Sequence, residues 1–301
     1  MKLSTRSIKQ ESIPNGNRLA RFQWLPTVIV LGAMTAGGLG WVEASPALRL
    51  LMSTIVLYLA FKVAAVVKQR EHWSNMSTEA WLWYWTIWPG MQLAGFGTRT
   101  AVADPTWLRR GLAGLITGLT LLTGITVVEI GDYVTGWLAV FGLLVTVHFG
   151  YADVLSWFMR TRGFDVQRLF NAPERSTTLN DFWTRRWNVA FVEMDRVLFM
   201  PALRRLNRRW APFLMLLASG VMHELALSYP AGGGWGLPMI YFAVHGAGMH
   251  LERSPWFAAT SNTFKQWWTR ILVLTPVGLV FHGPFRTELP LQLISQLKGL
   301  L

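Results

Sequence analysis

Two short stretches of the sequence combine residue types that could do chemistry. In the first, ASGVMHEL, His223 lies about two-thirds of the way along an apolar run, with Glu224 beside it. A histidine titrates near neutral pH and can take a hydroxyl proton as a general base. The alternative is a histidine that only hydrogen-bonds a neighbouring helix. Gly220 would let another backbone or a ligand approach this face closely.

The second stretch is TTLNDFWTRRWN, residues 177–188. A capping box from Thr178 to Asp181 predicts a helix that begins near Leu179. Spacing on a regular helix then defines two sides. One side would hold Asp181, Arg185 and Asn188, and the other Trp183 and Trp187. Two interpretations stay open: a surface helix that its tryptophans anchor at the headgroup level, or one wall of an active site.

Two further histidines lie in apolar runs. His148 and Asp153 form an H-x4-D pattern, but residues at i and i+5 do not share a helix face, so we do not expect the two to act together. His245 lies in YFAVHGAGMHLER, beside Gly246, in a pattern typical of close helix packing. We expect His245 either to line the same cavity as His223 or to bridge helices.

The composition indicates the elements that must position these residues. The chain has 301 residues, of which 52% are hydrophobic and 15% charged, which is typical of an integral membrane protein rather than a soluble one. We therefore expect an all-α, polytopic transmembrane bundle formed by one domain, 1–301. The absence of cysteine excludes disulfides, thiolate metal sites and a cysteine acyl-enzyme.

About seven apolar runs are candidates for membrane crossings, since a crossing needs about 20 residues. They lie near 25–42, 47–67, 111–130, 134–158, 211–229, 235–250 and 270–284, and the last two are short enough to be tilted or partly re-entrant. Two other apolar pieces, 80–97 and 189–200, are expected to be interfacial or re-entrant. Pro89-Gly90 would break a helix in the first of these.

The charges predict an orientation. Most of the 28 Lys and Arg residues fall in 1–24, 68–110, 159–210 and 251–269, which places these segments and the N-terminus in the cytoplasm by the positive-inside rule. The net charge of +12 therefore does not indicate nucleic-acid binding, and the seventeen tryptophans fit interfacial belts. We expect a multi-pass protein of a bacterial inner membrane, in contact with membrane lipids.

Several catalytic motifs are absent from the sequence. It has no GxxxxGK[ST] loop, no HExxH and no Asp-rich pair of the kind that holds magnesium diphosphate. It also shows no internal repeat of the kind frequent in transporters. We therefore expect a site without a metal or other cofactor, built on histidine and bordered by an arginine-rich rim.

The segment LFNAPERSTTLNDFWTRRWN, residues 169–188, resembles the signature of the membrane-bound O-acyltransferase superfamily in its wax-synthase-like branch. That signature is approximately F-x-x-P-x-x-[ST]-x-S-L-x-[DE]-F-W-[GS]-R-R-W-[NH]. The residues that match it are Phe170, Pro173, Leu179, Asp181, Phe182, Trp183, Arg185, Arg186, Trp187 and Asn188. ASGVMHEL, YFAVHGAGMHLER and LVFHGPF resemble the family's later elements, so the resemblance covers roughly residues 165–285. Thr178 and Thr184 depart from the usual Ser and small residue.

The resemblance implies a helical fold that encloses a catalytic tunnel, and transfer of an acyl group from a coenzyme A thioester to a hydroxyl. It makes His223 the catalytic histidine and Asn188 its polar partner, with acyl-CoA as co-substrate and a lipophilic alcohol as acceptor. The residues expected to surround the substrates are Asp181, Trp183, Arg185, Arg186, Trp187, Glu224 and His245. Within the helix, Asp181 and Arg185 would set the element in place, and Asn188 would point towards His223.

Two questions stay open at this point. The arginines 204, 205, 208 and 209 could bind the phosphates of coenzyme A or only set the topology against anionic lipid, and we favour the second. The alternative function is a transporter or lipid-binding protein that uses His223 and His245 in a polar pathway.

Overall fold

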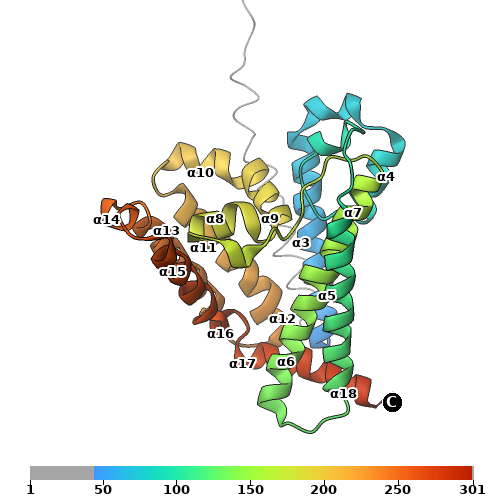
Figure 1. The fold of residues 1–301 in the computed structure, drawn as a ribbon, viewed down its shortest axis with the longest axis vertical. Helices are drawn as coiled ribbons and strands as arrows, with labels where there is room; N and C mark the ends of the chain where they lie inside the picture. Colours follow the sequence, from blue (N-terminus) through green and yellow to red (C-terminus); the bar gives the residue numbers. More distant parts are fainter. Residues whose placement is uncertain (1–43, 300–301) are drawn as a thin grey trace, which may run out of the picture.

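The computed structural model describes residues 44–299 (Figure 1). The regular elements of this part of the chain are helices, joined by turns and loops, and its one isolated β-bridge pairs Arg99 with Phe164, so the all-α prediction is confirmed for it. The α-helices are α3 Pro46–Lys68, α4 Thr78–Thr86, α5 Pro105–Gly124, α6 Asp132–Leu144, α7 Ala152–Thr161, α8 Leu179–Asp181, α9 Val189–Met194, α10 Met200–Leu206, α11 Ala211–His223, α12 Tyr229–Ala231, α13 Leu237–Leu251, α14 Pro255–Ala258, α15 Asn262–Leu274, α16 Val277–Val280, α17 Gly283–Arg286 and α18 Gln292–Lys298.

Five π-helical segments join or follow these helices. They are Val145–Tyr151 (η3), Phe182–Arg186 (η5), Asp195–Phe199 (η6), Glu224–Ser228 (η7) and Thr287–Leu291 (η8). A π-helical turn holds one residue more than an α-helical turn, so it shifts the face on which the following residues lie. Such segments are rare and often mark functional sites.

Within residues 44–299, three continuous helices are long and apolar enough to cross a membrane: Pro46–Lys68, Asp132–Thr161 and Ala211–Ala231. They correspond to the runs predicted at 47–67, 134–158 and 211–229. The runs predicted at 111–130 and 235–250 form α5 and α13, while the run at 25–42 and the segment 1–24 lie outside the described residues. The total of seven crossings and the tunnel stay predictions.

The run 270–284, predicted to be a short crossing that is tilted or partly re-entrant, does not form one continuous helix. The chain there consists of the end of α15, the four-residue α16 and the start of α17. Pro276 and Pro284 have no N–H to donate, so each begins a new helix instead of continuing one. The apolar composition of this run predicts a crossing, but its two prolines break the helix.

The two segments predicted to be re-entrant differ from each other. The predicted break at Pro89-Gly90 is confirmed, because α4 ends at Thr86 and an irregular segment follows. Buried polar groups bind that irregular backbone: the Lys62 ammonium donates to the carbonyl oxygens of Trp88 (2.6 Å) and Gly90 (2.7 Å). The second piece, 189–200, is part of a longer helical run through α9, η6 and α10. Its buried Glu193 accepts from the Met91 N–H at 2.8 Å, so α9 is tied to the irregular segment.

Glycines let α5 lie directly against the helix Asp132–Thr161. A Cβ atom added to Gly114 would lie 2.8 Å from the backbone nitrogen of Gly150, and one added to Gly118 would lie 2.7 Å from that of Thr146. Small residues at this spacing bring helix backbones together in membrane proteins, where van der Waals packing must replace the hydrophobic effect. This contact fixes the position of η3, which carries His148.

The helices are arranged between two ends of the molecule (Figure 1). The elements rich in arginine and tryptophan, including α4, the end of α7 and α10, gather towards the top of the view. The connection between α5 and α6 lies at the bottom. The segments 68–110 and 159–210, which the charge pattern grouped together, therefore lie towards one end, although the side of the membrane that this end faces stays a prediction.

Candidate active site

The segment 177–188 begins as predicted and then departs from a regular helix. The Thr178 hydroxyl accepts from the Asp181 N–H at 2.9 Å, and α8 begins at Leu179. The π-helical η5 follows, after which Trp187 is extended (φ −100°, ψ 123°) and Asn188 is left-handed (φ 46°, ψ 64°). The prediction that Asn188 shares a helix side with Asp181 is therefore wrong, because the helix has ended before Asn188.

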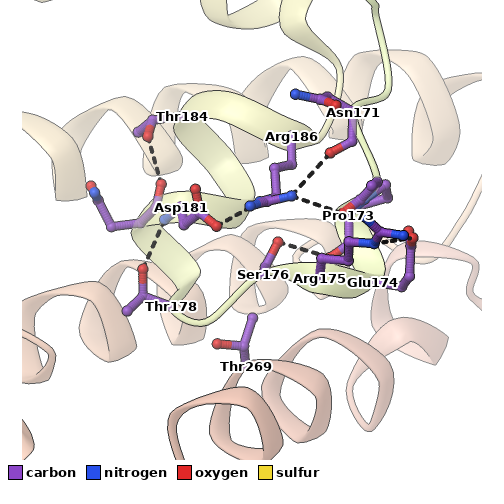
Figure 2. A network of polar contacts seen from close by, with 12 residues as sticks. Asn171, Pro173, Glu174, Arg175, Ser176, Thr178, Asp181, Thr184, Arg186 and Thr269 are labelled. Carbon is purple, nitrogen blue, oxygen red and sulfur yellow. Dashed lines mark hydrogen bonds and ion pairs between the residues drawn. The ribbon is translucent and has the colours of Figure 1, made fainter. Parts of the chain in front are cut away.

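The prediction that Asp181 and Arg185 fix this helix is also wrong: the partner of Asp181 is Arg186 (Figure 2). The Arg186 Nε lies 2.6 Å from the Asp181 Oδ2, and its Nη1 donates to the carbonyl oxygen of Ala172 at 3.2 Å. The π-helical turn explains the change, since it brings residues five apart onto one side. Arg186 thus joins the helix to the loop before it, whereas Arg185 is exposed and has no bonded partner in residues 44–299.

Trp183 and Trp187 lie in different clusters, although regular spacing had placed them on one side. Trp183 packs against Phe242 and His245, each at 5.4 Å between ring centroids. Trp187 stacks with Phe182, at 5.4 Å and 14°, and with His148, at 5.7 Å and 18°. The motif therefore contacts both α13 and the helix Asp132–Thr161.

Asn188 is the N-cap of α9. Its side-chain oxygen accepts from the Phe191 N–H at 3.3 Å. Two backbone hydrogen bonds hold the neighbouring chain: the Val189 N–H donates to the Leu169 oxygen, and the Asn171 N–H donates to the Arg186 oxygen, each at 2.8 Å. Asparagine tolerates the left-handed conformation better than most residues, which suits it to this turn.

His223 is the last residue of α11, and one hydrogen bond fixes its tautomer. Its Nδ1 lies 2.8 Å from the Ser219 carbonyl oxygen. A carbonyl oxygen only accepts, so Nδ1 carries the hydrogen and the neutral ring presents an unprotonated Nε2. The ring packs against Phe242 at 4.5 Å and against Phe191 at 6.2 Å. Phe191 belongs to the helix that Asn188 begins, so the structure brings the two predicted catalytic residues to one region.

Glu224 and Gly220 position α13 against α11. One Glu224 oxygen accepts from the N–H groups of Gly236 (2.9 Å) and Met239 (3.1 Å), at the start of α13. A Cβ atom on Gly220 would lie 3.1 Å from the Met239 Cα, so the close approach expected at Gly220 is that of another backbone. The second Glu224 oxygen and the Trp183 indole nitrogen are buried without a partner in the described residues.

His245 is fully buried in α13. Its Nδ1 lies 2.8 Å from the Tyr241 carbonyl oxygen, and its ring contacts those of Tyr241, at 4.1 Å, and Trp183. The predicted close packing is confirmed next to it, since a Cβ atom on Gly246 would lie 2.5 Å from the Phe213 ring. Trp183 and Phe242 contact each other, and His245 packs against the first of these rings and His223 against the second.

His148 and Asp153 have separate partners, as expected. The Asp153 carboxylate forms a two-pronged ion pair with Arg168, and only 1% of the Asp153 side chain is exposed. His148 instead contacts the motif aromatics Trp187 and Phe170. The H-x4-D pattern is therefore not a catalytic pair.

Glu252 is a positioning residue for which sequence reasoning gave no role. Its carboxylate oxygens accept from the N–H groups of Leu179 (2.5 Å) and Asn180 (3.1 Å), so it caps the first turn of α8 from 73 and 72 positions away. Burial raises the pKa of the Glu252 carboxyl, and these two backbone donors act in the opposite direction. The sequence feature that could have pointed to Glu252 is its place as the final Glu of the element that resembles F-x-x-H-G-x-x-x-x-x-E.

His282 and Ser228 lie together as a base and a nucleophile would, but the tautomer of His282 cannot take the serine proton. The Ser228 hydroxyl lies 3.2 Å from the His282 Nε2, and both side chains are buried. However, the His282 Nδ1 accepts the Phe285 N–H at 3.2 Å, so Nε2 carries the hydrogen and donates to the serine. This histidine begins α17 and ties it to η7.

Comparison with known proteins gives a family match over the same region. Residues 166–244 match the membrane bound O-acyl transferase family. The chain is 33% identical over 78 residues to a long-chain-alcohol O-fatty-acyltransferase of Simmondsia chinensis, which covers 23% of this chain and 22% of that protein. It is 32% identical over 124 residues to a probable long-chain-alcohol O-fatty-acyltransferase 3 of Arabidopsis thaliana, which covers 36% and 34% of the two chains.

A longer match is weaker in identity. The probable long-chain-alcohol O-fatty-acyltransferase 2 of Arabidopsis thaliana is 27% identical over 154 residues, 44% of this chain and 43% of that protein. The chain therefore aligns with less than half of the length of each of these relatives. The family match over residues 166–244 includes both Asn188 and His223.

Proposed function

We propose that this chain is a membrane-bound O-acyltransferase of the wax-synthase-like branch and that it transfers an acyl group from acyl-CoA to the hydroxyl of a lipophilic alcohol. The family match over residues 166–244 and the names of the relatives support this proposal. A long-chain fatty alcohol is the acceptor that the relatives' names support. The product would then be a wax ester and free coenzyme A. The same support favours acyl transfer over the alternative of transport through a polar pathway.

The observation that carries this proposal is the tautomer of His223. The Ser219 carbonyl holds the hydrogen on Nδ1, so Nε2 is the atom able to accept a proton. The ring lies within the continuous helix Ala211–Ala231, which is long and apolar enough to cross a membrane, and an ionisable residue at such a position often lines a polar cavity or a reaction path. Aromatic rings from the motif region and from α13 surround it.

The chemistry follows from that atom. As the acceptor hydroxyl attacks the thioester carbonyl, its proton moves to the His223 Nε2 and the new C–O bond forms. The carbon–sulfur bond then breaks, and the imidazolium returns the proton to the coenzyme A thiolate. We propose direct attack because the sequence contains no cysteine to form a thioester intermediate.

Asn188 and Trp183 are the donors that we propose for the developing oxyanion. The Asn188 oxygen accepts from Phe191, so its amide N–H groups are the part of the side chain left to donate. The Trp183 indole N–H is buried and has no acceptor in residues 44–299. Donors placed where negative charge develops each contribute roughly 3–4 kcal/mol to catalysis.

The test is ester synthesis by the purified protein in lipid nanodiscs, with a labelled acyl-CoA and a panel of fatty alcohols, sterols and terpenoid alcohols. We expect ester and stoichiometric coenzyme A with fatty alcohols. His223→Ala should lower kcat by roughly 100-fold or more, since it removes the general base. Asn188→Ala should lower kcat by a similar factor with a smaller change in KM.

His72→Ala is the matched control, because His72 is partly exposed in the segment Arg70–Asn75 and contacts Glu71. Its activity should equal that of the wild type. Unchanged ester synthesis in His223→Ala would reject the base, and unchanged coenzyme A release in Asn188→Ala would reject the oxyanion donor. No ester with any alcohol of the panel would reject the proposed function itself.

A further inference from the structure

Trp187 lies in a three-ring stack that joins the motif to a candidate membrane span. The Phe182 ring stacks with the indole at 5.4 Å between centroids and 14° between planes. The His148 ring also stacks with the indole, at 5.7 Å and 18°. The Phe170 ring meets the same indole edge-on at 5.1 Å. The Phe149 ring, from the same helix as His148, meets the indole edge-on at 6.3 Å, so the indole contacts four rings from three segments of the chain.

The position of this indole determines the backbone that leads to Asn188. Trp187 is the extended residue between η5 and the left-handed Asn188, so its side chain is the anchor nearest to the change of direction. A non-glycine residue in the left-handed region costs roughly 1–3 kcal/mol and persists only where its surroundings hold it. The two backbone hydrogen bonds at Arg186 and Val189 hold the chain ends, and the stack holds the side chain between them.

His148 is the member of the stack that comes from another helix. It lies in the π-helical η3, in the middle of the helix Asp132–Thr161. The glycine contact of α5 with Gly150 fixes this part of the helix in place. The Asp153 carboxylate is bound to Arg168, so it does not orient the His148 ring.

We propose that His148 is a positioning residue for the reaction: its ring holds Trp187 in the stack and thereby fixes Asn188 at the start of α9. The inference rests on the proposed function, because the quantity that it affects is acyl transfer. The role belongs to the aromatic ring and not to a proton on it. A phenylalanine at 148 should therefore replace the histidine.

The experiment compares His148→Phe with His148→Ala in the nanodisc assay, and measures kcat, KM for both substrates and the pH profile of kcat. His148→Ala should lower kcat by roughly 10- to 100-fold, because a small displacement of a catalytic group has an effect of this size. Its KM for acyl-CoA should change by less than about threefold, because uniform binding is kept. His148→Phe should retain kcat within about threefold and should have the wild-type pH profile.

A double variant tests the route through Asn188. If His148 acts by placing Asn188, His148→Ala should lower kcat little further in an Asn188→Ala background, because residues in contact or in one network are not additive. If His148→Ala does not fold, His148→Leu, which fills the space without an aromatic ring, carries the same expectation. Thermal unfolding of each variant checks the fold, and His72→Ala is the control.

Three results would overturn the inference in an active wild-type enzyme. The first is an unchanged kcat in His148→Ala. The second is an equal loss of kcat in His148→Phe and His148→Ala, which would assign the role to the ring nitrogens. The third is full additivity of the effects of His148→Ala and Asn188→Ala on kcat. An inactive wild type would reject the proposed function instead, so the two failures are distinguishable.

Discussion

At the scale of single residues, His223 and His282 show how one hydrogen bond determines what an imidazole can do. The His223 Nδ1 faces a carbonyl oxygen, so its Nε2 can accept a proton. The His282 Nδ1 faces a backbone N–H, so its Nε2 donates to Ser228. Both histidines lie in segments that resemble family elements. Only the first has the tautomer of a base.

Ser228→Ala should therefore leave catalysis intact. The His282 Nε2 already carries a hydrogen and cannot take the serine proton, so the serine is an acceptor that ties η7 to α17. We expect kcat within about twofold of the wild type, and a loss of roughly 1 kcal/mol in the free energy of unfolding. Steady-state kinetics and denaturation in detergent measure the two effects. A loss of kcat above about 100-fold with unchanged stability would make Ser228 a nucleophile.

Substitutions of the neighbours Arg185 and Arg186 should affect different quantities: the KM for acyl-CoA for the first and the free energy of unfolding for the second. Arg186→Gln should lower the free energy of unfolding by roughly 1.5–3 kcal/mol, because it removes charged hydrogen bonds to Asp181 and to the Ala172 carbonyl. Arg185 is exposed and makes no such bond within the described residues. Arg185→Gln should therefore leave stability unchanged and raise KM for acyl-CoA by roughly 10-fold, if it binds a phosphate. A stability loss in Arg185→Gln equal to that of Arg186→Gln would contradict this division.

At the scale of elements, the contact of α5 with the helix Asp132–Thr161 is made of glycines. Gly114→Ala would place a Cβ atom 2.8 Å from the Gly150 nitrogen and 2.9 Å from its Cα. A backbone cannot yield as a side chain can, so the helices must separate. We expect a loss of roughly 1–3 kcal/mol in stability and a lower kcat, because η3 carries His148.

Gly124→Ala is the matched control for that variant. Gly124 ends the same helix, and a Cβ atom there would meet nothing within 4 Å. The substitution should be neutral or stabilise by up to roughly 1 kcal/mol, since alanine favours the helix more than glycine does. Thermal unfolding of both variants in one detergent gives the comparison. Equal stability of Gly114→Ala and the wild type would mean that the helices are not closely packed.

The sequence predicts those features of the fold that local rules determine. The start of α8 follows from Thr178, the break after α4 from Pro89, and the three long apolar helices from their length and composition. The place of Asn188 does not follow, because the 3.6-residue period does not show where a π-helical turn adds a residue. The cap from Glu252 to Leu179 joins positions 73 residues apart, which no local pattern encodes.

At the scale of the whole molecule, the two ends differ in the sign of their charges. The arginines of 204–209 are exposed around α10, next to Leu206, which is 77% exposed. Glu129 and Asp132 lie at the other end, around the connection from α5 to α6, next to Val127, which is also 77% exposed (Figure 1). The positive-inside rule predicts that the first end faces the cytoplasm.

Single cysteines test this orientation directly, because the chain contains no cysteine of its own. Leu206→Cys and Val127→Cys are exposed to the same extent, at opposite ends of the molecule. When the chain is expressed in intact bacterial cells, a membrane-impermeant maleimide should label Val127→Cys, and should label Leu206→Cys only after the membrane is opened. The positive-inside rule gives the reason, since the arginines around Leu206 stay in the cytoplasm. Labelling of both variants from outside would show that the two ends do not lie on opposite sides. The reverse pattern would invert the orientation, and it would place the exposed guanidinium of Arg185 away from the cytoplasmic supply of acyl-CoA.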